Sequence, residues 1–118
     1  MSKLQLGIAA LVMLAACAAP TAQQRAADSE LSALAPLRGS YPVVVGFDVK
    51  TPTTLVVSLD LQTYIGMSDE DTASMKRAVV DRWRTAWIEA HPKSRAILHV
   101  RFIDFIGREV GEAVTAVR

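Results

Sequence analysis

The sequence predicts a small two-layer α+β domain in which an antiparallel sheet carries one amphipathic helix on one face. Two segments with strand-like alternation, 43–50 and 54–62, precede a helical segment at 68–91. Two further strand-like segments, 96–106 and 109–117, follow it, which gives the order ββαββ. A helix packed across such a sheet would bury every apolar stripe of the chain at once.

The helix at 68–91 has the clearest pattern. Ser68 is a favourable N-cap, and the acidic residues 69–71 would lie at the positive end of the helix dipole. Pro92 disfavours helical geometry at His91, so the helix should end there. One apolar stripe recurs at helical spacing and includes both tryptophans: Met75, Val79, Trp83, Ala86, Trp87 and Ala90.

The strands are defined by period-two alternation and by turn residues between them. Thr51-Pro52-Thr53 separates the first two and favours a hairpin, and Gly107-Arg108 separates the last two. A short helix from Gly111 is the alternative for the last segment, but Gly111 and the two valines that follow it favour a strand.

Composition sets limits on function. The 118 residues are 51% hydrophobic and 21% charged, which is typical of a globular chain and allows one domain. Lys3 is the only charged residue among residues 1–16, so the remainder carries 12 basic and 12 acidic residues. A protein that neutralises nucleic-acid phosphates normally has a basic excess, and we expect no nucleic-acid partner.

The first 16 residues have the form of a secretory signal. Lys3 is followed by an apolar run over residues 6–14 and then by two alanines. This run of about nine residues is too short to cross a bilayer, which needs about 20. The signal ends at Cys17, the only cysteine in the chain, which excludes an intramolecular disulfide and a cysteine-based zinc site.

The segment Leu14-Ala15-Ala16-Cys17 resembles the lipobox of bacterial lipoproteins. The resemblance implies that residues 1–16 are cleaved, that the Cys17 thiol carries a diacylglyceryl group, and that the new amine is acylated. Two or three acyl chains make a persistent membrane anchor. Ala18 in place of an aspartate implies the outer membrane, facing the periplasm. The alternative is a plain secretory signal cut near Ala16 or Ala19.

Residues 17–39 are rich in alanine and small polar residues, and we expect a lipid-attached flexible tether before a domain at 40–118. The alternative is a short helix at 26–35 that Pro36 ends and that docks through Leu31 and Leu34.

The chain lacks the usual signatures of catalysis and cofactor binding. It has no GxSxG motif and no glycine-rich phosphate loop, so we expect no enzyme activity and no cofactor. His91 and His99 do not have the spacing of a helical metal pair, and alternation places Asp104 on the face opposite His99. We therefore expect no zinc site, with His91 at a helix end and His99 on a strand surface.

The carboxylates on the strands have a structural interpretation. Asp48, Asp60 and Asp104 lie within or at the ends of predicted strands, where two of them could be neighbours. A pair of catalytic carboxylates needs one member in an apolar pocket, and a domain this small offers little room for one. Pairing with Arg101 or Arg108 is the simpler expectation.

Two features suggest a partner surface. Arg82 and Arg84 flank Trp83, and arginine and tryptophan are enriched at interfaces, although the helical stripe predicts that both tryptophans face the sheet. The strand Val43–Val49, with Val43 and Val45, would offer an unpaired edge for β-augmentation or for a homodimer.

We consider three functions. The first is a membrane-anchored envelope lipoprotein whose noncatalytic domain binds another envelope protein as a scaffold, assembly factor or stabiliser. The second is a module that binds peptidoglycan or lipopolysaccharide. The third is a small envelope enzyme. Lipid anchoring, neutral charge and small size favour the first.

Overall fold

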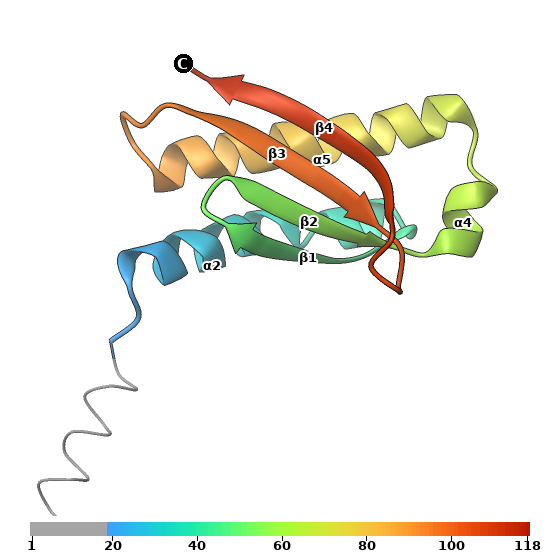
Figure 1. Ribbon diagram of the computed structural model, residues 1–118, viewed down its shortest axis with the longest axis horizontal. Helices are drawn as coiled ribbons and strands as arrows, with labels where there is room; N and C mark the ends of the chain where they lie inside the picture. The colour runs from blue at the N-terminus through green and yellow to red at the C-terminus, as the bar shows by residue number, and fades with distance from the viewer. Residues whose placement is uncertain (1–18) are drawn as a thin grey trace, which may run out of the picture.

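The computed structural model describes residues 19–118, which form a four-stranded sheet with helices on one face (Figure 1). The predicted α+β class and the ββαββ order are confirmed, and the predicted signal and Cys17 lie outside the described residues. Within residues 19–118, no helix combines the length and apolar character that crossing a membrane requires. The elements in chain order are α2 (Ala22–Leu34), α3 (Leu37–Ser40), β1 (Val44–Thr51), β2 (Thr54–Leu59), α4 (Leu61–Ile65), α5 (Asp69–Ala90), β3 (Ala96–Ile103) and β4 (Glu109–Val117).

The sheet is mixed, which corrects the antiparallel sheet that we expected. Its strands lie in the order β1-β2-β3-β4, and the two hairpins β1–β2 and β3–β4 are antiparallel. The central strands β2 and β3 are parallel, with Leu55 beside Val100 and Val57 beside Phe102. The reason is the connection: α5 has 22 residues, about 33 Å of helix, and returns the chain to the end where β2 began.

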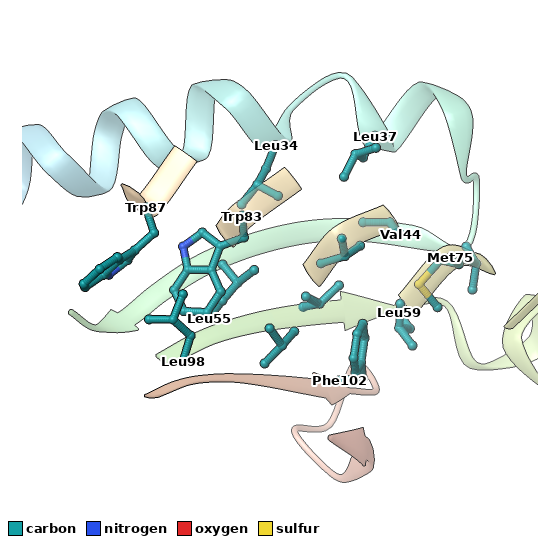
Figure 2. Packing of buried hydrophobic residues seen from close by; sticks show 14 of the residues in the cluster. Leu34, Leu37, Val44, Leu55, Leu59, Met75, Trp83, Trp87, Leu98 and Phe102 are labelled. Carbon is teal, nitrogen blue, oxygen red and sulfur yellow. The ribbon is translucent and has the colours of Figure 1, made fainter. Parts of the chain in front are cut away.

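The core lies between the sheet and the helices (Figure 2). The predicted stripe of α5 is buried except for Ala90 at its end, and Met75, Val79 and Trp83 have no exposed surface. The sheet contributes one face of each central strand, which is the alternation that the sequence predicts: Leu55, Val57 and Leu59 from β2, and Leu98, Val100 and Phe102 from β3. Ser68 caps α5 by accepting a hydrogen bond from the Asp71 amide, as expected.

Two predicted strands end earlier than the sequence suggested, each time at an aspartate. Asp60 ends β2 because its carboxylate accepts hydrogen bonds from the amide and hydroxyl of Thr63 and caps the short helix α4. Asp104 ends β3 because its carboxylate binds the backbone of the following turn. The segment 109–117 is a strand, as favoured over the helical alternative.

Residues 22–34, which we expected within a flexible tether, form the helix α2 and pack against α5 and β1. Thr21 and Gln24 form a reciprocal capping box at its start. Leu34 is fully buried in the core and Leu37 of α3 extends the same contact (Figure 2). The helical alternative for 26–35 was therefore correct, and the packed unit begins near residue 21 rather than at residue 40.

We expect Leu34→Ala to lower the free energy of unfolding by about 2–5 kcal/mol, because it leaves a cavity in the core. The exposed neighbour Ser32 provides a matched control, and Ser32→Ala should change stability by less than about 0.5 kcal/mol. Urea denaturation of both variants measures the difference. Equal effects of the two substitutions would show that α2 is not docked.

Candidate functional site

The predicted partner residues do not form one surface. Val43 is buried in the core, which excludes it from partner contact, while Val45 is exposed. The register of β1 against β2 shifts between Val44 and Gly46, so this edge is irregular. The Val43–Val49 edge prediction is therefore wrong at its first residue, because Val43 packs beneath the helices.

The two predicted arginines lie in different surroundings. Arg84 donates a hydrogen bond through Nε to the Ala116 carbonyl at 3.3 Å. Arg82 is exposed and lines a shallow groove with Leu37, Ala78, Asp81 and Thr85. Trp83 and Trp87 are buried, as the helical stripe predicted.

The two histidines occupy the separate places that we expected, one at a helix end and one on a strand surface. His91 caps the C-terminus of α5, where its Nδ1 donates to the Trp87 carbonyl at 3.0 Å and its ring stacks on the indole at 4.3 Å. His99 lies on the exposed sheet face, 3.4 Å from a Glu112 carboxylate oxygen. Among residues 19–118, no three potential metal ligands come together.

A buried carboxyl group lies between α2 and α5, and sequence reasoning missed it. Glu30 is fully buried, and the Trp83 indole Nε1 donates to its Oε1 at 2.6 Å. Within residues 19–118, neither its other oxygen Oε2 nor the buried Nε2 of His91 has a hydrogen-bond partner. One signal was available: Glu30 is four residues from Ala26 and from Leu34, and so lies on the docking stripe of a helix.

The environment of Glu30 favours its protonated form. Burial raises the pKa of Glu30 above its ordinary value of 4.5, although the hydrogen bond from Trp83 and the nearby His91 lower it in part. The site can hold a proton between two helices.

A second site projects from the far end of the sheet. The turn between β3 and β4 and the short helix α4 lie at the end of the sheet opposite the start of α2 (Figure 1). Large apolar side chains are exposed there: Phe105 at 82%, Ile65 at 72% and Ile106 at 65%. We call these three residues the apolar tip.

The turn that carries Phe105 and Ile106 is stabilised by hydrogen bonds. The Asp104 carboxylate is buried and accepts hydrogen bonds from the Ile106 amide at 3.1 Å and from the amide and Nε of Arg108, each at 2.9 Å. Gly107 closes the turn with φ of 84°, a conformation that favours glycine. Burial alone would raise the pKa of Asp104, but the hydrogen bonds and the Arg108 charge outweigh it and lower the pKa. The expected pairing of Asp104 with Arg108 is confirmed.

Helix α4 is attached to the same end of the sheet through Tyr64. Its hydroxyl donates to the Val110 carbonyl at 3.4 Å, and the Lys76 ammonium group donates to it at 3.2 Å. The sequence placed Phe105 and Ile106 in a strand, so their exposure at a turn was not predicted.

No family model, no curated protein and no solved structure matches this chain.

We expect Glu30→Gln to remove a pH dependence of stability. Because the folded-state pKa of Glu30 is raised, its stabilising contribution is complete below the unfolded pKa and is lost as pH rises through the folded pKa. Glutamine cannot ionise and still accepts the Trp83 hydrogen bond. Chemical denaturation between about pH 4 and pH 8 should show the variant gaining stability over the wild type as pH rises. A difference that stays constant across this range would contradict the assignment.

Proposed function

We propose that this protein is a lipid-anchored protein of the bacterial envelope whose noncatalytic domain binds another envelope protein, in a scaffolding, assembly or stabilising role. The anchor rests on the resemblance of Leu14-Ala15-Ala16-Cys17 to a lipobox. The partner-binding role rests on the apolar tip, which is the single observation that carries the proposal.

The chain leaves little slack between the proposed anchor and the domain. Only residues 18–21 separate Cys17 from the first residue of α2. Fully extended, the five steps from Cys17 to Ala22 span at most about 18 Å. An acylated Cys17 would therefore hold the start of α2 close to the membrane surface, while the apolar tip lies at the opposite end of the sheet (Figure 1).

The position of the apolar tip favours a protein as its partner. Phe105 and Ile106 are neighbours in one turn and Ile65 is exposed at the same end of the sheet, and large apolar side chains exposed at one end of a domain indicate an interaction site. Because the tip is directed away from the proposed anchor, the anchoring bilayer is not placed to receive it. The hydrogen bonds of Asp104 fix the turn before binding, which reduces the entropy lost on association.

The anchor is tested by Cys17→Ser in the native bacterium. We expect the wild type in the membrane fraction and the variant in the soluble periplasmic fraction, because the variant lacks the thiol that receives lipid. Mass spectrometry of the wild type should show an acylated N-terminal cysteine. A wild type that is soluble and unacylated would contradict the anchor.

The apolar tip is tested by a photo-crosslinking residue at position 105 in living cells. We expect one or a few discrete protein adducts, which should disappear when Ile65→Ser and Ile106→Ser are added. All three positions are exposed, so these substitutions should change the free energy of unfolding by less than about 0.5 kcal/mol.

The same probe at Ile88, which is exposed on α5, is the matched control. It should not give the adducts found at position 105. Identical adducts from both positions, or adducts to lipid alone, would contradict a protein-binding role for the tip.

A further inference from the structure

The outer edge of β4 carries free backbone hydrogen-bonding groups. β4 is the last strand of the sheet, and among residues 19–118 only β3 pairs with it (Figure 1). The His99 amide donates a hydrogen bond to the Thr53 carbonyl at 2.9 Å, on the side of β3 that faces β2. The backbone groups of His99 therefore point away from β4. Val114, which lies opposite His99, must therefore direct its own N–H and C=O outward.

A second contact shows that the even-numbered residues of β4 direct their backbone groups outward. The Ala116 carbonyl accepts a hydrogen bond from the Arg84 side chain, which approaches from outside the sheet. Residues two apart on a strand direct their backbone groups to the same side. The outward groups of β4 are therefore those of Glu112, Val114 and Ala116, which are also exposed.

The sequence of this edge is complementary to itself. Residues 112–118 read Glu-Ala-Val-Thr-Ala-Val-Arg. When two copies run antiparallel about Thr115, Glu112 lies opposite Arg118 of the second copy, and Val114 lies opposite Ala116 of the second copy. Each of these pairs joins residues of even number, which is the set whose backbone groups point outward. Moving the register by two residues keeps the backbone pairing but separates Glu112 from Arg118.

The exposed apolar residues of the sheet support the same pairing. Ile97 is 60% exposed and Val114 is 58% exposed, and Ile97 lies beside Ala116 in the β3–β4 ladder. Pairing two β4 strands about Thr115 would place Val114 of the second copy next to Ala116. A row of apolar side chains would then cross the junction, running from Ile97 through Ala116 to Val114 of the second copy.

We propose that two copies of this chain associate through β4, antiparallel and centred on Thr115, so that their sheets join into one. The other edge strand is a poorer candidate, because β1 carries register shifts and contacts α2 and α3. The Arg84 contact does not block the pairing, because a carbonyl oxygen can accept two hydrogen bonds. This proposal is independent of the anchor and of the apolar tip.

The backbone pairing is tested by sedimentation of the full-length chain in a mild detergent. Val114→Pro removes an outward N–H without removing a β3–β4 hydrogen bond, so it should raise the dimer dissociation constant by at least about tenfold. Val114→Thr keeps that N–H and should remain dimeric. A wild type that stays monomeric at its highest soluble concentration would overturn the proposal, as would equal dimerisation of both variants.

The register is tested by charge reversal and by crosslinking. Glu112→Arg alone and Arg118→Glu alone should each weaken the dimer, and the double variant should restore it. In a Cys17→Ser background, Thr115→Cys should form a disulfide across the two-fold axis, because directly opposed residues lie within disulfide reach. Ala113→Cys, which would face Val117 of the second copy, should not. A charge-reversed pair that fails to recover, or equal crosslinking at both positions, would overturn the register.

Discussion

The packing of Trp83 between the sheet and two helices is the contact on which the rest of this structure depends. Its ring is fully buried in the core (Figure 2). Its indole nitrogen donates a hydrogen bond to the Glu30 carboxyl group on α2. Removing α2 would expose this ring and would leave a buried donor without a partner, which costs about 1–3 kcal/mol. The N-terminal helix is therefore part of the packed unit, and it fixes where the preceding chain leaves the domain.

The fixed position of α2 gives the molecule two distinct ends. The chain enters at the start of α2, and the β3–β4 turn and α4 lie at the other end of the sheet (Figure 1). Asp104 stabilises the turn, and Tyr64 attaches α4 beside it. A rigid body with an apolar tip remote from its attachment point suits a protein that is held at a membrane and binds a partner away from it.

The mixed sheet determines which surfaces remain open. In the sheet that residues 19–118 form, the parallel central strands are covered by their neighbours, and β1 and β4 lie at the edges. The register shift after Val44 distorts β1, a common protection of edge strands against unwanted pairing. β4 lacks that protection over residues 112–118, where Val114 is exposed. An unprotected edge with complementary charges at its two ends is consistent with controlled pairing of two copies.

Local sequence patterns predicted α5 and the four strands because each has a long periodic apolar face. Alternation alone does not give the direction of β3, because it is the same in parallel and antiparallel strands, but the length of the predicted helix between β2 and β3 was a signal for a parallel pair. The stretch that forms α2 was expected to be a tether because its composition is small and polar, and its order depends on contacts of Leu34 and Glu30 with distant residues. The ends of β2 and β3 were missed because Asp60 and Asp104 turn the chain through side-chain hydrogen bonds. Val43 was predicted on a partner surface because the docking of α2 was not predicted. In the structure α2 and α3 cover its end of β1 and bury it.

The most direct measurement is the distance distribution between spin labels at Asp28 on α2 and at Phe105 in the apolar tip. It would be recorded by pulsed electron paramagnetic resonance on the full-length chain with Cys17 replaced by serine. Both positions are exposed, so the labels should not disturb the core. With the labelled chain diluted in an excess of unlabelled chain, so that only distances within one copy are recorded, a docked α2 and a fixed turn predict a single narrow distribution. A broad distribution would contradict a rigid domain with the anchor and the tip held at opposite ends.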